Sequence, residues 1–125
     1  MEQTTELNFQ QALEALKNGL GDAEDMRREY ERRRNFIHGA LNEMGLPCHL
    51  PQGAFYVFPC IGKYGLTSKQ FAHKLLDEES VACVPGDAFG QSGEGYLRCA
   101  YAAELEDIKE AMRRMAAFVQ RLAQG

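Results

Sequence analysis

One segment near the end of the chain restricts its possible folds more than any other: GEGYLRCAYA, at residues 93–102. Its aromatic and apolar residues predict a β-strand, in which successive side chains point to opposite faces of a sheet. One face then carries Tyr96, Arg98 and Ala100, and the other carries Leu97, Cys99 and Tyr101. Burial of an unpaired guanidinium is strongly unfavourable. Arg98 must therefore reach solvent or meet an anionic group.

The chain of 125 residues has the size of one domain, and 45% of its residues are hydrophobic. Its formal net charge of −4 argues against a broad nucleic-acid interface. No apolar run has the length of a membrane-spanning helix, and no signal peptide is recognisable. We expect a cytoplasmic protein that binds neither nucleic acid nor a membrane.

The sulfur and imidazole side chains do not predict a metal site. The cysteines are Cys48, Cys60, Cys83 and Cys99, and the histidines are His38, His49 and His73. None of them shows the spacing of a zinc site. Buried free thiols in a reducing compartment are the favoured interpretation, with no metal ligand and no catalytic cysteine.

A short basic stretch is interleaved with acidic residues. Its arginines are Arg27, Arg28, Arg32, Arg33 and Arg34. Glu24–Arg28 and Glu29–Arg33 have the i,i+4 spacing of helix-supporting ion pairs. This pattern favours a solvated helix face over a phosphate-binding site.

Hydrophobic spacing predicts a helix over residues 6–44, with a break at residues 18–22, where two glycines interrupt the pattern. Asp22 is expected to cap its second part, and Gly45 is expected to end it. Prolines restrict the extended piece at residues 46–51 to a sheet edge or a connecting arm.

Two further amphipathic helices are expected. The first covers residues 68–79, is capped by Thr67 or Ser68, and has an apolar face made of Phe71, Leu75 and Leu76. The second covers residues 105–122, and its inward side chains are Leu105, Ile108, Met112, Met115, Phe118 and Leu122.

Strands are expected over residues 54–61 and 81–84, with a loop at residues 87–94 before the Arg98 segment. The element order is long helix, two strands, helix, two strands, helix. It predicts an α+β fold, in which a small, mostly antiparallel sheet of three to four strands packs against helices. Residues 1–125 are expected to form a single domain.

Three motifs in this order resemble one known family. They are PQGAFYVFP at residues 51–59, VPGDAFG at residues 84–90 and GEGYLRCAYA at residues 93–102. Together they resemble the C-terminal small domain of the class I/II (fold-type I) pyridoxal-phosphate-dependent aminotransferases. The residues before the first motif are similar to that family's long interdomain helix, so the resemblance covers nearly the whole chain.

The resemblance implies a role for the arginine. In the family, the small domain closes over a cofactor held by the large domain, and an arginine in the last strand binds the α-carboxylate of the substrate. Arg98 matches that position, and its planar fork of donors suits a carboxylate. A strand arginine that reaches solvent is the alternative.

Four other residues lie near the substrate pocket by the same resemblance. Gly53, Ala54 and Phe55 belong to a turn that approaches the substrate, although a purely structural turn is equally consistent with them. Phe89 belongs to a loop at the closing edge of the site, but core packing is the favoured interpretation for its side chain. For Tyr56, packing is favoured over a catalytic role.

The family's Schiff-base lysine, its aspartate and its phosphate-binding residues lie in the large domain, which this sequence lacks. The lysines of this chain are Lys17, Lys63, Lys69, Lys74 and Lys109, and none stands in the family's lysine motif. We therefore expect no catalytic and no cofactor-binding residue in this chain. Alone, it should be inactive and hold no pyridoxal phosphate, whether it is a fragment or a naturally short protein.

The resemblance implies a substrate-clamping domain of an enzyme that transfers an amino group from an amino acid to a 2-oxo acid. Its partners would be the substrate carboxylate, the large domain that binds pyridoxal phosphate, and a second subunit in a homodimer. Two alternatives stay open. One is a stand-alone module that binds carboxylates or a partner chain, and the other is the same domain in a pyridoxal-phosphate-dependent lyase or synthase.

Overall fold

The structure is a computed structural model that describes residues 20–51 and 55–125, with side chains inside the first helix from residue 24 onward. The chain divides into two compact units, Met1–Glu31 and Arg32–Gly125. Helix α2 (Leu20–Glu43) begins in the first unit, where Glu24 and Arg27 form an ion pair of 2.6 Å. The part of the predicted first helix before residue 20 lies outside the described residues.

The start of α2 corrects one expectation. Because the helix already includes Leu20, Asp22 is an interior residue, and the N-cap expected at this position is wrong. A glycine inside a helix costs only about 1 kcal/mol relative to alanine, so Gly21 weakens this turn without ending it.

The end of α2 follows the sequence. Gly45 has a φ of 98°, which is the left-handed conformation expected of a residue just after a helix. The Gly45 N–H donates to the carbonyl of Asn42 at 3.2 Å, and the Leu46 N–H donates to the carbonyl of Leu41 at 2.9 Å. These are the two hydrogen bonds of a Schellman motif, and they turn the chain back toward the sheet.

Arg33 lies inside the second unit and not on a solvated face. Its side chain is only 10% exposed. Nη1 donates to the carbonyl of Ala102 at 3.1 Å, and Nη2 lies 3.5 Å from the carboxylate of Glu104. The predicted solvated face is therefore wrong for this arginine, because a distant carbonyl supplies a partner that local charge spacing cannot reveal.

Helix α3 (Ser68–Glu79) begins as predicted. Thr67 is its N-cap, and its side chain accepts a hydrogen bond from the Gln70 N–H while the Gln70 side chain accepts from the Thr67 N–H, which completes a capping box. Phe71 and Leu75 are fully buried, as expected. Leu76 is 50% exposed, so its expected place on the apolar face is wrong. The third buried apolar side chain of this face is that of Ala72.

The sheet has three antiparallel strands in the order β1-β3-β2. They are β1 (Tyr56–Val57), β2 (Val84–Pro85) and β3 (Leu97–Ala100). Both outer strands are shorter than expected, and β2 begins three residues later than the predicted strand. The pairing with β1 extends beyond the strand by an isolated bridge between Cys60 and Tyr96.

The expected loop before β3 is not irregular. It consists of two short 3-10 helices, η2 (Gly86–Phe89) and η3 (Gln91–Gly93). A third, η1 (Gly62–Tyr64), follows the β1 segment. The turns at η2 and η3 fix the path of the chain directly before the arginine strand.

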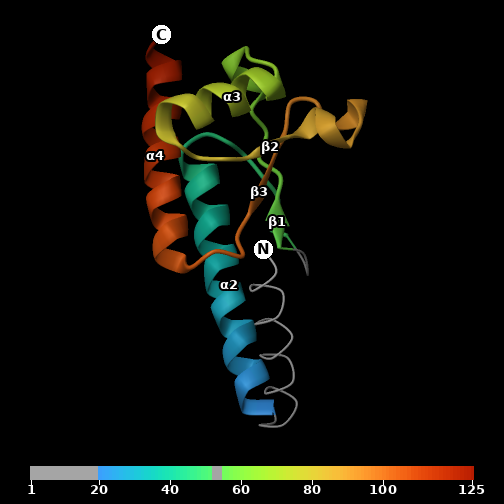
Figure 1. The fold of residues 1–125 in the computed structure, drawn as a ribbon, viewed down its shortest axis with the longest axis vertical. Coiled ribbons are helices and arrows are strands. Elements are labelled where there is room, and N and C mark those ends of the chain that lie inside the picture. Colours follow the sequence, from blue (N-terminus) through green and yellow to red (C-terminus); the bar gives the residue numbers. More distant parts are fainter. Residues whose placement is uncertain (1–19, 52–54) are drawn as a thin grey trace. The chain divides into compact units, whose positions relative to one another are not determined.

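Helix α4 (Leu105–Gln124) has two acidic residues in its first turn and buries one apolar face. Ile108, Met112, Met115 and Phe118 point inward as predicted, whereas Leu105 and Leu122 are only partly buried. Figure 1 shows α4 beside the part of α2 that belongs to the second unit, on one side of the strands, with α3 across one end.

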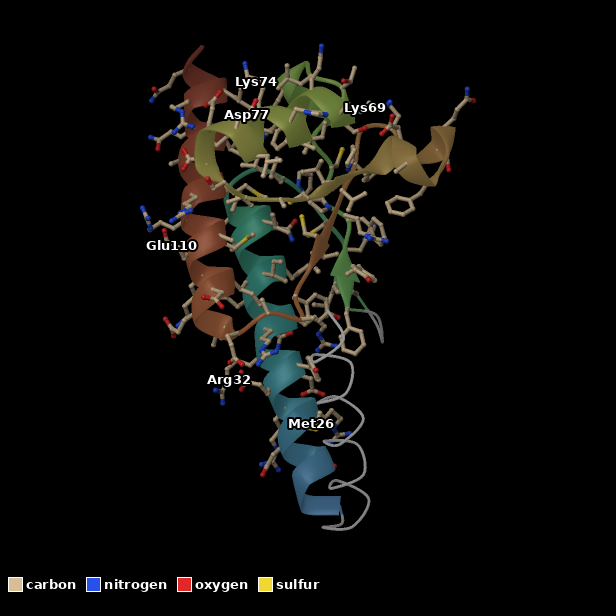
Figure 2. All side chains as sticks on the ribbon, viewed as in Figure 1. Met26, Arg32, Lys69, Lys74, Asp77 and Glu110 are labelled. Carbon is tan, nitrogen blue, oxygen red and sulfur yellow. The ribbon has the colours of Figure 1, made fainter. Side chains whose placement is uncertain are left out.

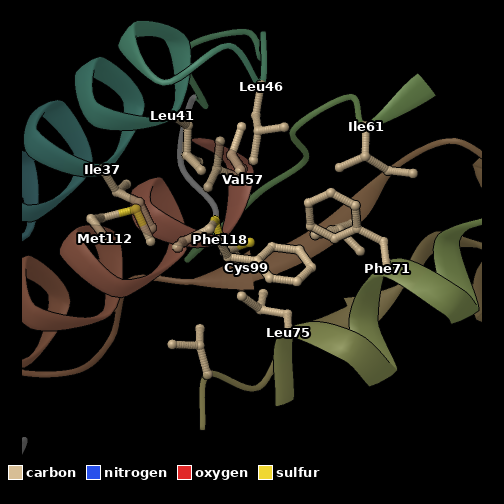
Figure 3. Packing of buried hydrophobic residues seen from close by; sticks show 14 of the residues in the cluster. Ile37, Leu41, Leu46, Val57, Ile61, Phe71, Leu75, Cys99, Met112 and Phe118 are labelled. Carbon is tan, nitrogen blue, oxygen red and sulfur yellow. The ribbon is translucent and has the colours of Figure 1, made fainter. Parts of the chain in front are cut away.

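The core lies between the helices and one face of the sheet (Figure 3). The rings of Phe71 and Phe118 meet edge to face at 5.2 Å near its centre. The fold is thus α+β, with a small antiparallel sheet against helices, as the sequence predicts. Within the described residues, no helix has both the length and the apolar character needed to cross a lipid bilayer.

Candidate functional site

Arg98 lies on the face of the sheet opposite to the core. Along β3, Leu97 and Cys99 are 0% and 4% exposed, while Arg98 is partly buried and Ala100 is exposed. The predicted alternation is therefore confirmed. Arg98 is paired with Val84 of β2, so it sits in the middle strand and not at a sheet edge.

Two aromatic rings flank the guanidinium of Arg98. Its Cζ lies 4.3 Å from the centre of the Tyr56 ring and 4.6 Å from the centre of the Phe89 ring. Both distances are well inside the range of cation–π contacts. Two further exposed aromatic side chains, Phe58 and Tyr96, lie nearby in the same segments. We call these four residues, Tyr56, Phe58, Phe89 and Tyr96, the aromatic face.

No side chain or carbonyl within residues 24–51 and 55–125 accepts a hydrogen bond from Arg98 or forms an ion pair with it. A guanidinium has five N–H donors in one plane. Aromatic rings contact a guanidinium mainly over its flat face, so the two ring contacts leave donors at its edge for an oxygen ligand. The arrangement suits a planar anion with two oxygens, such as a carboxylate.

The loop that carries Phe89 is tied to the N-terminus of α3. The Ser68 N–H donates to the Glu94 carboxylate at 2.8 Å, and the Ser68 hydroxyl donates to the other oxygen of that carboxylate at 2.9 Å. The Asp87 N–H in turn donates to the Ser68 hydroxyl at 3.4 Å. Ser68 is fully buried, and this network therefore fixes both η2 and the turn before β3.

The acidic groups of this loop are occupied elsewhere. The hydrogen bonds from the Ser68 N–H and hydroxyl lower the pKa of Glu94. Asp87 lies 3.5 Å from the ammonium of Lys69. Both carboxylates therefore have partners on α3, and Arg98 has no counter-ion from its own loop.

Two glycines bring the ends of this loop into backbone contact. A Cβ placed on Gly86 would lie 2.0 Å from the carbonyl oxygen of Gly93, and one placed on Gly93 would lie 2.1 Å from that of Gly86. No other residue fits at either position without a backbone shift. The close approach holds η2 against the start of β3, and so holds Phe89 near Arg98.

The other predicted substrate-binding residues are Gly53, Ala54 and Phe55. Gly53 and Ala54 fall outside the described residues. Phe55 is 50% exposed, and its ring centre is 6.4 Å from that of Tyr101, whose side chain is buried on the helix side of the sheet. Their roles stay predictions.

The described residues do not fit pyridoxal phosphate. Lys63, Lys69, Lys74 and Lys109 are all exposed, and Figure 2 shows Lys69 and Lys74 on the outer side of α3. A helix N-terminus is a common phosphate site, but that of α3 is already taken by the Glu94 carboxylate. The cofactor implied by the resemblance would need residues that this part of the chain does not supply.

None of the four cysteines is fully exposed. The Sγ atoms of Cys83 and Cys99 are 3.2 Å apart, and all four cysteines are free. The neighbouring Cys83 thiol and burial raise the pKa of Cys99 well above its usual value, so it stays a protonated, poor nucleophile at neutral pH. Within the described residues, no group of three His, Cys, Asp or Glu side chains could hold a metal ion.

A groove that does not include Arg98 lies between α4 and the last turns of α2. It has a volume of about 970 Å³, and its lining includes Phe36, Ala40, Met112 and Ala116 together with the basic Lys63, Lys109 and Arg113. Its lining also includes the acidic Glu43, but Arg98 is not part of it, and we do not consider it the carboxylate site. Its size reflects an open channel between two helices.

Sequence reasoning found Arg98 but missed its two ring contacts. Phe89 was expected in the core, yet it is 50% exposed and packs on the guanidinium, so that expectation is wrong. Tyr56 packs, as expected, but on the charge of Arg98. Alternation along the two strands was the available signal for Tyr56, because it puts Tyr56 and Arg98 on one face.

Comparison with known proteins gives a consistent result. The sequence model of the family described as aminotransferase class I and II matches residues 5–115. The chain is 58% identical over 92 residues to aromatic-amino-acid aminotransferase 2 of Thermococcus litoralis, covering 74% of this chain and 24% of that protein. It is 56% identical over 92 residues to the aspartate aminotransferase of Pyrococcus abyssi, again covering 74% and 24%.

The fold agrees with the sequence. The structure of an aromatic aminotransferase from Pyrococcus horikoshii matches with a TM-score of 0.76 and 53% identity, over 78% of this chain and 26% of that chain. An alanine aminotransferase from Pyrococcus furiosus matches with a TM-score of 0.75 and 34% identity, over 78% and 25%. The chain thus spans about a quarter of the length of the relatives it matches.

Proposed function

The chain belongs to the aminotransferase class I and II family, and from this premise we propose that it is the C-terminal small domain of a pyridoxal-phosphate-dependent aminotransferase. In the complete enzyme, an amino group would pass from an amino acid to a 2-oxo acid. The relatives' names support transamination over a lyase or synthase reaction, since they include aromatic-amino-acid and aspartate aminotransferases.

Arg98 would bind the α-carboxylate of the substrate. The observation that carries this proposal is a guanidinium on an open sheet face, flanked by two rings and with no acceptor of its own among the described residues. A carboxylate held by two parallel N–H···O bonds has a fixed orientation. That fixed orientation would align the reacting bond of the substrate with the cofactor.

The cofactor and the reacting lysine would come from a large domain outside this sequence. The exposed lysines and the occupied N-terminus of α3 support this division of roles. Pyridoxal phosphate, when bound there, supplies the electron sink for transamination. This chain would contribute substrate binding and exclusion of water, Gly53, Ala54 and Phe55 would line the pocket, and the enzyme would act as a homodimer. A cytoplasmic location stays a prediction.

The decisive test is Arg98→Lys in the full-length enzyme. Lysine keeps the charge but loses the planar fork, so kcat/KM for the amino acid should fall. The decrease should correspond to a loss of about 2–4 kcal/mol of transition-state stabilisation. Arg113→Lys is a matched control, because Arg113 is an exposed arginine of α4 whose partner is Glu110. An unchanged kcat/KM for Arg98→Lys would contradict the proposal.

A second test concerns the cofactor. Borohydride reduction of the 125-residue chain mixed with pyridoxal phosphate should trap no stoichiometric adduct at a single lysine. The full-length enzyme should give such an adduct at a lysine outside this segment. Peptide mass spectrometry locates the adduct, and a single modified lysine within this chain would refute the division of roles.

A stand-alone binding module is the second candidate, and the aromatic face favours it. Its four side chains are between 38% and 50% exposed, and clusters of exposed aromatic groups mark interaction surfaces. Under our main proposal, the large domain covers this face. Sedimentation of the isolated chain separates the two, since a monomer without a partner weakens the module hypothesis.

A further inference from the structure

We propose that Tyr56 and Phe89 are positioning residues that hold the guanidinium of Arg98 in the orientation that accepts a carboxylate. This inference rests on the proposed function and adds two residues to it. Each ring centre lies within 4.6 Å of the Arg98 Cζ. Of the described aromatic side chains, these two are the ones that contact the guanidinium.

The register of the sheet places Tyr56. Tyr56 pairs with Ala100, which puts it diagonally across from Arg98 on the same face. Diagonal neighbours on antiparallel strands are within reach of long and aromatic side chains. The ring of Tyr56 is therefore delivered to Arg98 by backbone pairing, and this placement does not depend on a ligand.

A different element places Phe89. It is the last residue of η2, whose start is held by the contact between Gly86 and Gly93 and by the hydrogen bond from the Asp87 N–H to the Ser68 hydroxyl. Half of the Phe89 side chain is exposed. The anchored loop thus holds an apolar ring at the surface, where the guanidinium of Arg98 is its charged neighbour.

The contacts have a physical consequence for binding. An arginine side chain has many rotamers, and immobilising it opposes ligand binding. Two rings restrict those rotamers before a ligand arrives. Because rings offer no strong acceptor, they stabilise the cation without using the N–H donors that a carboxylate needs. A carboxylate neighbour would fix the side chain as well, but it would compete with the substrate.

The test uses the full-length enzyme, with the amino donor chosen as the most active of the twenty protein amino acids. Tyr56→Leu and Phe89→Leu remove a ring but keep an apolar side chain. Each should lower kcat/KM about 3- to 10-fold, which corresponds to one cation–π contact. Tyr56→Phe and Phe89→Tyr, which keep the ring, should stay within about twofold of the wild type.

Leu76→Ala is the control, because Leu76 is a 50% exposed apolar residue of α3 that lies outside the aromatic face. It should change kcat/KM by less than about twofold. Urea midpoints are recorded for every variant, and a methionine replacement is used wherever leucine lowers the midpoint.

A double-mutant cycle separates positioning from general structural damage. With Arg98→Gln already present, Tyr56→Leu and Phe89→Leu should have effects below about twofold, because the rings act through Arg98. Undiminished losses in that background, or leucine variants with wild-type kcat/KM, would overturn the inference. If Arg98→Gln alone leaves kcat/KM unchanged, or if no amino acid is a substrate, the proposed function itself fails.

Discussion

The two faces of β3 differ in what their side chains contact. On the helix side, Leu97 and Cys99 are almost completely buried against α3 and α4. On the other side, Arg98 lies among exposed rings and has no protein acceptor among the described residues. One face holds the domain together, and the other presents a charge. Because alternate residues point to opposite faces, one short strand can carry both tasks.

The comparison predicts different consequences of substitution on each face, and the largest belongs to the core. Phe71→Ala removes a fully buried ring that meets Phe118 edge to face, so it should lower the free energy of unfolding by about 3–5 kcal/mol. Urea denaturation measures this change. Tyr96→Ala, on the exposed face, should stay within about 0.5 kcal/mol. Equal losses in the two variants would remove the distinction between the faces.

The glycine contact behind Phe89 should give an intermediate effect. Gly86→Ala places a methyl group 2.0 Å from a carbonyl oxygen, so the backbone must move, and stability should fall by about 1–3 kcal/mol. At Gly39 in α2, a Cβ would meet no other atom within 4 Å. Gly39→Ala should therefore stabilise the fold by about 0.5–1 kcal/mol, because alanine favours a helix over glycine. Thermal unfolding of both variants tests the pair, and a neutral Gly86→Ala would mean that the loop is not fixed there.

The loop also predicts a dependence on pH. Donation by Ser68 lowers the pKa of Glu94 below its ordinary value of 4.5 in the folded state. The resulting stabilisation is complete above that value, and it is lost as the pH falls through the folded pKa. Glu94→Gln should therefore flatten the acid side of the stability profile. Thr67→Ala removes another cap of α3 without a titrating group, and it should leave that slope unchanged.

The smallest effect on stability is expected for Arg98 itself. Arg98→Met keeps a long side chain against the rings and removes a charge that has no hydrogen-bond acceptor or ion-pair partner among the described residues, so the free energy of unfolding should change by less than about 0.5 kcal/mol. The same variant should lose binding of the substrate carboxylate in the full-length enzyme. A destabilisation above about 2 kcal/mol would assign Arg98 a structural role.

The sequence predicts best the features that depend on the local spacing of apolar residues. The positions of α3 and α4, the glycine after α2 and the two faces of β3 all follow from spacing. Strand lengths do not, because they depend on pairing with β3, a different segment of the chain, which no local pattern records. The N-cap expected at Asp22 was wrong for a similar reason, since packing and neighbouring residues outweigh a weak local preference. The break expected at residues 18–22 lies partly outside the described residues and stays a prediction.

The candidate site likewise has features that the sequence predicts and features that it does not. Arg98 could be recognised from its apolar surroundings and its motif, but its ring neighbours could not, because Tyr56 comes from a distant strand and Phe89 from the preceding loop. Phe89 reaches it through a loop closed by Gly86 and Gly93. In the same way, Arg33 of α2 reaches the carbonyl of Ala102, which lies between β3 and α4. Such contacts depend on tertiary structure. An aromatic residue in a loop does not reveal whether it packs on the core or on a charge.

The closed loop also has an entropic consequence. Bringing the ends of a flexible segment together costs conformational entropy, and a segment that is closed only on ligand binding weakens the affinity by that cost. The segment between Gly86 and Gly93 is already closed, with backbone touching backbone. Under the proposed function, Phe89 would therefore have little freedom left to lose when a carboxylate binds Arg98, and the entropy of closing the loop would be lost during folding and not during substrate binding.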